Sequence, residues 1–494
     1  MSGTLTSADV LSPAPILEAV ERWRGTIVDL DASRSLTADE FAWAREALIA
    51  SLRRHGVSPG DRVVLAVANG PLFIAALTAL LACDACPLLV HFKTPPAEIK
   101  RYADRFGARF LACQRREEPD AGQLAATAVD IDFAGLDRLC LAALDAGEPN
   151  GAALHGVPLH PTSGSTGLPK IALRPGFAAI EEARHYVETM GIGPDDCIAA
   201  MPPMSHAYGY GMCVMVPLVS GASIVSTQRF SSKMIHRALA EFSVSILPTV
   251  PAMLDMLTFG TVADVKNVRW VLTAGATLPL RSAERFRTKT GVVPCPLYGT
   301  TETGGISVAT AADGQDVDGR VGPPMQGVSV EVRRQAGSSE FGPDEFGAEI
   351  GKLFVRSSSM MHGYLEDDGR ITTPTDGWFE TGDLARVGAD GMIHLRGRDS
   401  EVVNVSGMKV VPCEVEEAIA ALSGVREVKV YGGELGAGNQ VVKAAVAVEA
   451  GITAADVRAH CHRNLVYYKQ PHVVTLVDAL PRTATGKIIR EQLP

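Results

Sequence analysis

Hydrophobic positions in the first two thirds of the chain follow two alternating periods. Segments with helical spacing, such as residues 37–55 and 72–83, alternate with short apolar runs at 62–67 and 87–90. Further apolar runs, with helical segments between them, lie at residues 197–200, 222–225, 244–247 and 268–273. Strands that alternate with helices in this way form parallel sheets covered by helices. We therefore expect an α/β fold.

The pattern changes after Gly319 to short alternating strands separated by glycines, at residues 328–332, 352–355 and 392–395. Such a pattern is typical of an antiparallel, barrel-like sheet. We therefore expect residues 1–398 to form one large N-terminal domain, in which helix-covered β-sheets are joined to this barrel-like portion.

A second change follows Arg398. Helical spacing at residues 413–422 and 454–465 flanks two apolar strands at 425–431 and 441–448. The pattern predicts a small, separate α+β domain over residues 399–494, a length within the usual range for a domain.

Two long apolar stretches, residues 72–92 and 197–228, have to be weighed as membrane spans. The first contains Asp84 and Pro87, and the second is interrupted by several prolines and glycines. Neither offers the roughly 20 uninterrupted apolar residues of a spanning helix, so we expect both to be buried core. The first nine residues lack the basic and apolar regions of a signal peptide.

Composition excludes several classes of protein. The 494 residues are 46% hydrophobic and 21% charged, which indicates a folded chain. With 46 Lys and Arg against 56 Asp and Glu, the net charge of −10 gives no footprint for nucleic acid or an anionic membrane. Nine scattered cysteines, an odd number, favour a reduced, cytoplasmic setting. Cys83 and Cys86 lack nearby partners for a metal site and are expected to be structural.

The strongest local motif lies at residues 161–170. Its glycines let the backbone approach an anion, its hydroxyls add donors and its lysine adds charge, as in a phosphate-binding loop. Leu168 and Pro169 follow the last glycine, so this is not a Walker A loop. On this segment alone, a polar surface loop is an equal alternative. The candidate phosphate ligands are Thr162, Ser163, Gly164, Ser165, Thr166, Gly167 and Lys170.

A second motif, Tyr298-Gly299-Thr300-Thr301-Glu302, follows an apolar run. Glu302 offers a hard oxygen ligand suited to Mg²⁺, and Thr301 could bond a phosphate oxygen. Tyr298 offers a flat face to a nucleobase. Taken alone, a turn rich in Gly and Thr with one glutamate is more often a plain turn.

Two further segments carry groups suited to a sugar and to a carboxylate. Asp383 could accept both hydroxyls of a ribose while Arg398 donates, although an aspartate can equally cap a turn. Lys487 ends a loop that contains Gly486 and could deliver an ammonium charge into a cleft. A lysine near a C-terminus is by itself usually solvated.

In this order and spacing, the four motifs resemble the adenylate-forming superfamily of acyl- and aryl-CoA synthetases, adenylation domains and beetle luciferases. The resemblance covers residues 35–493 and includes the segments 361–364 and 468–471. It implies that the loop at 162–170 grips the phosphates of ATP and that a carboxylate attacks the α-phosphorus, giving an acyl-AMP and pyrophosphate. No general base is needed, because a carboxylate is already deprotonated at neutral pH.

The resemblance also implies roles for individual residues. Thr301 and Glu302 would handle the α-phosphate and Mg²⁺, and Lys487 would be the catalytic lysine that bridges the α-phosphate and the substrate carboxylate. Asp383 and Arg398 would hold the ribose. The remaining ATP-binding positions would be Gly275, Ala276 and Tyr298 at the adenine, with the adjoining Gly299 and Thr300.

Members of the superfamily rotate the small domain about a hinge, so that the lysine leaves and a channel for an acceptor thiol forms. The hinge matches Ser400, where Asp or Lys is usual, with Asp399 one residue earlier. Asn404 stands where Lys is common. The resemblance thus implies a mobile C-terminal domain, and these departures concern the thioester-forming step.

The acid pocket should be walled by residues 205–212 and 248–251. No acidic residue occurs from position 197 to 228, whereas amino-acid-activating relatives place an Asp here, so an α-amino acid is not expected as the acid. Aromatic and glycine residues suit an aromatic or compact apolar carboxylic acid. Either tyrosine could instead be core. The pocket candidates are His206, Tyr208, Gly209, Tyr210, Val250 and Pro251.

The leading hypothesis is a ligase that uses ATP and Mg²⁺ to join a carboxylic acid to CoA. An amide-forming ligase, in which an amine captures the acyl-AMP, is the alternative, and loading of a carrier protein is a third. A non-catalytic nucleotide-binding protein is a weaker hypothesis, because binding alone needs no mobile lysine.

Overall fold

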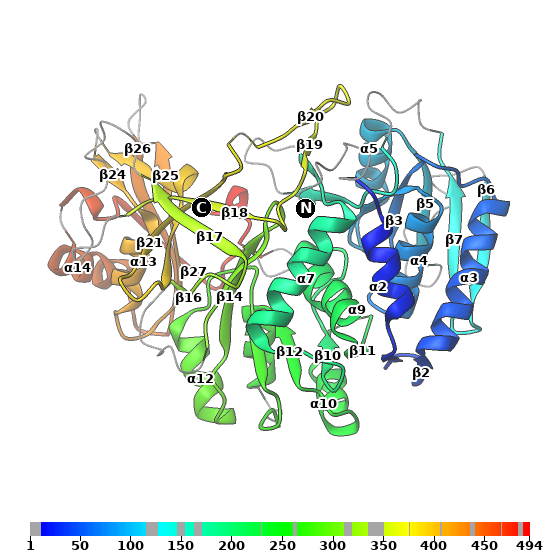
Figure 1. Ribbon diagram of the computed structural model, residues 1–494. Coiled ribbons are helices and arrows are strands. Elements are labelled where there is room, and N and C mark those ends of the chain that lie inside the picture. The colour runs from blue at the N-terminus through cyan, green and yellow to red at the C-terminus, as the bar shows by residue number, and fades with distance from the viewer. Residues whose placement is uncertain are drawn as a thin grey trace.

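The large N-terminal domain has five layers, in which two sheets alternate with three layers of helices (Figure 1). A third, smaller sheet and the C-terminal domain lie at the left of the view in Figure 1. The computed structural model describes residues 11–114, 127–145, 154–162, 170–228, 230–259, 264–310, 319–333, 350–374, 376–405, 408–434, 440–465, 467–482 and 488–494.

The first sheet has nine strands in the order β20-β19-β9-β8-β4-β3-β5-β7-β6. Its centre, from β8 to β5, is parallel, as the alternating pattern predicts, and its edges are antiparallel. The strands are β3 (Arg62–Ala66), β4 (Cys86–Leu89), β5 (Ala108–Gln114), β6 (Thr127–Phe133), β7 (Asp137–Ala143), β8 (Leu159–Thr162), β9 (Lys170–Leu173), β19 (Gly363–Leu365) and β20 (Ile371–Thr372).

The second sheet has eight strands in the order β15-β14-β13-β12-β10-β11-β1-β2. It is parallel from β14 to β1, and only the two edge pairs are antiparallel. The strands are β1 (Thr26–Asp29), β2 (Arg34–Thr37), β10 (Cys197–Ala200), β11 (Ser223–Ser226), β12 (Ile246–Thr249), β13 (Trp270–Thr273), β14 (Cys295–Thr300) and β15 (Gly304–Val308).

Helices cover both faces of each sheet, which explains why the central strands read as continuous apolar runs. In β3, Val63 packs into the core between the sheets and Val64 into the outer core. The middle layer contains α2 (Ala14–Arg22), α3 (Ala38–Arg54), α4 (Pro71–Ala82), α7 (Gly176–Met190), α8 (Ala207–Gly209), the π-helical η1 (Tyr210–Met215) and α9 (Val216–Ser220). The outer helices are α5 (Pro96–Phe106) on the first sheet and α10 (Ser232–Glu241), α11 (Pro251–Leu257) and α12 (Leu280–Thr290) on the second.

The third sheet is antiparallel, as the alternating pattern predicts, in the order β16-β22-β21-β18-β17. Its strands are β16 (Arg320–Gly322), β17 (Val328–Arg333), β18 (Gly351–Ser357), β21 (Phe379–Val387) and β22 (Ile393–Arg398).

The C-terminal domain has its own core of valines from strands and helices, which confirms the prediction of a small α+β domain. Its elements are η3 (Asp399–Glu401), β23 (Val403–Val405), β24 (Met408–Val410), α13 (Pro412–Ala420), β25 (Val425–Glu434), β26 (Gln440–Val448), α14 (Ala454–Asn464), η4 (Tyr467–Lys469), β27 (Val473–Val477) and η5 (Arg490–Gln492).

The two long apolar stretches of the sequence are core, as predicted. Every residue of α4 except the last is buried, and so is the whole of η1. No helix among the described residues has the length and hydrophobicity needed to span a bilayer. All nine cysteines carry free thiols, and Cys83 and Cys86 are both buried.

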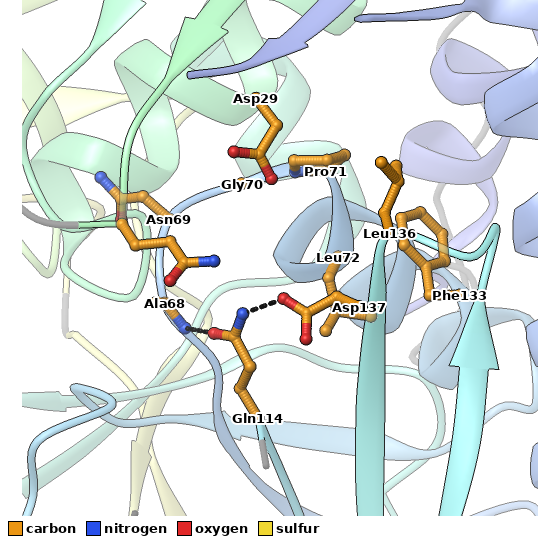
Figure 2. A pocket seen from close by; sticks show the side chains of 11 residues that line it. Asp29, Ala68, Asn69, Gly70, Pro71, Leu72, Gln114, Phe133, Leu136 and Asp137 are labelled. Carbon is orange, nitrogen blue, oxygen red and sulfur yellow. Dashed lines mark hydrogen bonds between the residues drawn. The ribbon is translucent and has the colours of Figure 1, made fainter. Parts of the chain in front are cut away.

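One buried side chain ties the two large sheets together. Asn69 follows β3, and its Nδ2 donates to the carbonyl of Pro202 at 2.8 Å while its Oδ1 accepts from Met204 N at 2.8 Å. Figure 2 shows Asn69 beside a small polar pocket that Gln114 and Asp137 also line. None of the residues that the motifs single out lines this pocket. We therefore assign it to the junction between the two sheets and not to the candidate site.

We expect Phe73→Ala to lower the free energy of unfolding by about 3–5 kcal/mol, because Phe73 is fully buried between the sheets and truncation leaves a cavity. Denaturant unfolding measures this change. Trp43→Ala in α3 is the control, since Trp43 is 71% exposed and its loss should cost little. An equal loss in both variants would contradict the assigned packing.

Candidate active site

The second motif forms the turn of the β14–β15 hairpin. Gly299 allows the two strands to approach closely, since a Cβ atom at this position would lie 2.4 Å from the carbonyl oxygen of Gly304. The turn is closed by the Oγ1 of Thr300, which accepts a hydrogen bond of 3.2 Å from Thr303 N. Thr301 and Glu302 lie at its tip and are half-buried.

Glu302 is held by a residue from the first sheet. The hydroxyl of Tyr364, in β19, donates to Glu302 Oε1 at 2.7 Å. Burial and the nearby carboxylate raise the pKa of Tyr364, so its phenol remains a donor at neutral pH. Lys170 Nζ lies 4.8 Å from the centre of the Tyr364 ring. Tyr364 therefore brings Glu302 close to the end of the predicted phosphate loop.

The predicted phosphate loop joins two paired strands. Thr162 ends β8 and is the register partner of Lys170, the first residue of β9. Thr162 is buried and Lys170 is exposed. Ser163, Gly164, Ser165, Thr166 and Gly167 lie outside the described residues, and so does Lys487.

Asp383 is held by two donors. It lies on β21 opposite Arg398 on β22, and its Oδ1 is 2.8 Å from Arg398 Nε. Its Oδ2 accepts a hydrogen bond of 2.5 Å from Tyr298 Oη. Burial and this carboxylate raise the pKa of Tyr298, which keeps the phenol protonated. Tyr298 and Arg398 together therefore fix the orientation of the Asp383 carboxylate.

The first residues after β13 and β12 lie close together. Gly275 has a φ of +84°, a conformation that favours glycine, and a Cβ on it would lie 3.7 Å from Val250 Cγ1. Gly275 and Ala276 are exposed, while Val250 and Pro251 are half-buried at the start of α11. The carboxyl ends of parallel strands therefore bring the adenine and acid-pocket candidates to one edge of the second sheet.

The candidate residues of the acid pocket divide into those with exposed surface and those that are buried. His206 is exposed and Tyr208 is half-buried, with its ring hydroxyl covered. Tyr210 is completely buried in the core between the sheets, 4.6 Å from the ring of His160. Gly209 packs so tightly that a Cβ would lie 2.1 Å from the Pro203 carbonyl oxygen. Of the two tyrosines, Tyr208 is thus the residue with some exposed surface.

The segment matched to the hinge is the short helix η3. Ser400 is exposed, whereas Asp399 is paired with Lys352 in β18, 2.9 Å from its Nζ. Lys352 also contacts Glu380 at 2.9 Å, and hydrogen bonds to these carboxylates raise its pKa. An ion pair therefore joins this segment to the third sheet.

Sequence motifs alone did not reveal the groups that hold the site from behind. The sequence motifs give Tyr364 no role beyond its place in the segment 361–364, and they contain neither Arg174 nor Glu182. Arg174 and Glu182 form an ion pair with 0% and 2% of their side chains exposed. Arg174 is the only charged residue between Lys170 and Glu181, and this isolated charge in an apolar stretch is the signal that could have found the pair.

The fold and this site together define an AMP-binding enzyme. Residues 17–365 match the family described as AMP-binding enzyme, so the chain belongs to that family. Residues 414–487 match the AMP-binding enzyme C-terminal domain. The predicted membership of the adenylate-forming superfamily is confirmed.

The similar proteins are named for different acids and for different types of bond formed. The chain is 28% identical over 484 residues to sulfoacetate–CoA ligase from Cupriavidus necator, covering 94% of this chain and 93% of the relative. It is 28% identical over 482 residues to feruloyl-CoA synthase from an Amycolatopsis species, covering 93% of each chain. Amide bond synthetase McbA from Marinactinospora thermotolerans superposes with a TM-score of 0.81 at 24% identity, over 97% of this chain and 99% of McbA. This last likeness concerns the fold.

We expect Tyr298→Phe to weaken AMP binding about 10-fold, because Asp383 loses a hydrogen bond to its charged form, a contact worth about 1.5–3 kcal/mol. Titration calorimetry with AMP measures the change. Tyr102→Phe, on the outer helix α5, is the matched control and should bind AMP as the unaltered protein does. Equal affinities of all three proteins would contradict the role of the Tyr298 hydroxyl.

Proposed function

We propose that the protein is an ATP-dependent carboxylic acid–CoA ligase, which forms an acyl-AMP, releases pyrophosphate and transfers the acyl group to CoA. The observation that carries this proposal is the gathering of Lys170, Tyr364 and Glu302 at the turn of the β14–β15 hairpin. Membership of the AMP-binding enzyme family and the CoA ligases among the relatives support it.

The residues of the site fit ATP and Mg²⁺. One oxygen of Glu302 accepts from Tyr364, and the carboxylate has further acceptor positions. The described residues contain no cluster of three His, Cys, Asp or Glu that could hold a metal ion. A single carboxylate together with substrate phosphates and waters is the usual environment of Mg²⁺ in nucleotide enzymes, so Glu302 would hold it. Bound there, Mg²⁺ would neutralise charge on the phosphates.

The other residues of the chain would bind and orient the nucleotide. In this proposal Thr162, Lys170 and residues 163–167 hold the β- and γ-phosphates, and Thr301 contacts the α-phosphate. Asp383, already aligned by Tyr298 and Arg398, accepts from the ribose hydroxyls. Gly275, Ala276, Gly299 and Thr300 line the adenine next to Tyr298. An oxygen of the acid then bonds to the α-phosphorus as the bond to pyrophosphate breaks.

Lys487 would supply the positive charge that this step requires. A carboxylate that approaches a polyphosphate is repelled, and a lysine aimed at the developing charge lowers the barrier. The proposal divides the chain into a domain of residues 1–398 and a mobile domain of residues 399–494. Rotation about Asp399 and Ser400 would break the pair between Asp399 and Lys352, remove Lys487 and open the thiol channel.

The acid would be aromatic or compact and apolar. Tyr208 offers its half-buried ring face to the substrate, with His206, Gly209, Val250 and Pro251 around it. Tyr210 would support the wall from the core. The relatives named for sulfoacetate and ferulate show how far the acid varies among similar chains, so the choice of acid rests on the pocket.

A second candidate function is amide formation, in which an amine captures the acyl-AMP without CoA. The fold likeness to an amide bond synthetase and the departures at Ser400 and Asn404 favour it. Both functions share the adenylation step and differ in the acceptor.

Pyrophosphate release across a panel of acids, with CoA or amines added separately, tests the proposal. We expect release to depend on an aryl or compact apolar acid, and thioester to form when CoA is present. Free α-amino acids should fail, because the described pocket segments offer no carboxylate for an α-ammonium group. Amide without thioester would favour the second function, and release with an α-amino acid alone would contradict the pocket.

We expect Glu302→Gln to abolish most adenylation while ATP binding survives in part, because the phosphates keep their loop contacts but lose an anionic Mg²⁺ ligand. Acid-dependent pyrophosphate release at limiting Mg²⁺ measures the effect. Glu331→Gln, an exposed position on β17, is the control. Undiminished release by the Glu302 variant would refute the assignment.

We expect Lys487→Ala to slow adenylation about 10²- to 10³-fold, comparable to the loss of one oxyanion donor, and to leave capture of supplied acyl-AMP intact.

We expect Ser400→Pro to abolish thioester formation and to leave adenylation largely intact, because proline restricts the hinge. Ser400→Ala is the control for this variant. Equal conversion of supplied acyl-AMP by Ser400→Pro, with amines preferred over CoA, would replace the CoA ligase with the amide-forming enzyme.

A further inference from the structure

A charged pair lies in the core directly behind the candidate active site. Arg174 follows β9 and Glu182 lies on α7. Counted over the whole residue, 0% of Arg174 and 1% of Glu182 are exposed. Arg174 Nη2 donates to Glu182 Oε2 at 2.8 Å. Such a pair is costly to bury, and a matched apolar pair is often neutral or stabilising in its place. Stability alone therefore gives little reason for these two residues.

The remaining contacts of the pair converge on the turn that carries Glu302. Arg174 Nη1 donates to the carbonyl of Thr301 at 3.2 Å, immediately before Glu302. Glu182 Oε1 accepts from the backbone of Gly305 at 3.1 Å, on the other side of the turn. Each partner thus holds one end of the segment 301–305.

The pair also connects the turn to the element that presents Tyr364. Arg174 Nη2 donates to the carbonyl of Ser359 at 3.2 Å, and Ser359 Oγ donates to the carbonyl of Thr303 at 2.7 Å. Met361 N donates to the carbonyl of Glu302 at 2.6 Å. The backbone around Glu302 and the strand of Tyr364 are therefore fixed by one hydrogen-bonded network with Arg174 at its centre.

Glu182 is packed closely against two glycines. A Cβ on Gly304 would lie 2.6 Å from Glu182 Cδ, and a Cβ on Gly211 would lie 2.5 Å from Glu182 Oε1. Gly304 belongs to the hairpin and Gly211 to the helix that continues from the acid-pocket segment. Glu182 is thus enclosed by backbone from both sides of the site.

We propose that Arg174 and Glu182 are a positioning pair, which holds the Thr301–Glu302 turn in the geometry that Mg²⁺-dependent ATP binding and adenylation require. Both side chains are buried and act through the backbone of the turn. The inference rests on the proposed role of Glu302. Displacing a catalytic group by about 1 Å can lower the reaction rate about 10²-fold. The rate gained by fixing the turn would therefore offset the free-energy cost of burying two charges.

The central test replaces both charges at once. Arg174→Met with Glu182→Leu removes the pair without leaving one charge alone in the core, which would be strongly destabilising. Arg174→Lys is the second variant, since it keeps a positive charge beside Glu182 but loses the guanidinium fork that reaches the carbonyls of Thr301 and Ser359. Arg45→Met is the matched control, because Arg45 is 5% exposed in α3, at the other side of the domain (Figure 1).

The first measurement needs no acid substrate and so is independent of the proposed ligase activity. ATP affinity is measured by titration calorimetry with Mg²⁺ and with EDTA. We expect the gain in affinity due to Mg²⁺ to fall about 10-fold in the double variant and about 3-fold in Arg174→Lys, with affinity in EDTA nearly unchanged. Arg45→Met should keep the full gain.

The second measurement is pyrophosphate release with any acid that the unaltered enzyme activates. We expect kcat to fall about 10²-fold in the double variant, with a smaller change in the KM for ATP, while thermal unfolding shows a folded protein. If the double variant does not fold, Arg174→Lys decides. The positioning role is overturned if a folded variant keeps both the Mg²⁺ gain and kcat, or if Arg45→Met loses them equally.

Discussion

Both carboxylates of the candidate site are held by a tyrosine hydroxyl from a different strand. Tyr364 donates to Glu302 and Tyr298 donates to Asp383. A carboxylate beside a polyphosphate is repelled by its own ligand unless neutral donors or cations fix it. A phenol whose pKa is raised by burial stays a donor, and it adds no positive charge that would pair with the phosphates in place of the metal. Tyr364 extends from the first sheet and Tyr298 from the second, so the relative placement of the sheets determines both contacts.

Local patterns allowed much of the fold to be predicted. Periodicity gave α3, α4 and the central strands within a few residues, because both faces of these sheets are covered and the apolar runs are unbroken. Periodicity carries no strand direction, so the antiparallel edges, such as β6 and β7, could not be anticipated. The family resemblance, for its part, assigned Tyr210 and Tyr208 equally to the acid pocket. The π-helical turn that begins at Tyr210 carries that ring into the core, and residue spacing does not predict such a turn.

The site separates into groups that a motif can identify and groups that it cannot. Glu302, Asp383 and Lys170 lie in segments whose composition already suggests phosphate or sugar chemistry. Tyr364 and Arg174 act on residues 62 and 127 positions away, so only the folded chain joins them. Their chemistry is also ambiguous in sequence, because a tyrosine in a strand or an arginine after one is most often packing or surface. Supporting groups are therefore the part of a site that depends on tertiary structure.

The strand order of the first sheet has a consequence for synthesis of the protein. β9, which begins at the end of the predicted phosphate loop, pairs with β8 on one side and with β19 on the other. The residues of β19 lie about 190 positions later in the chain than their partners in β9. At about 5–20 residues per second, a ribosome leaves that side of β9 without its neighbour for roughly 10–40 s. An unpaired strand edge is a template for association with other chains. The nascent chain is thus open to association with other chains at this edge, and a chaperone that covers the edge would act during that interval.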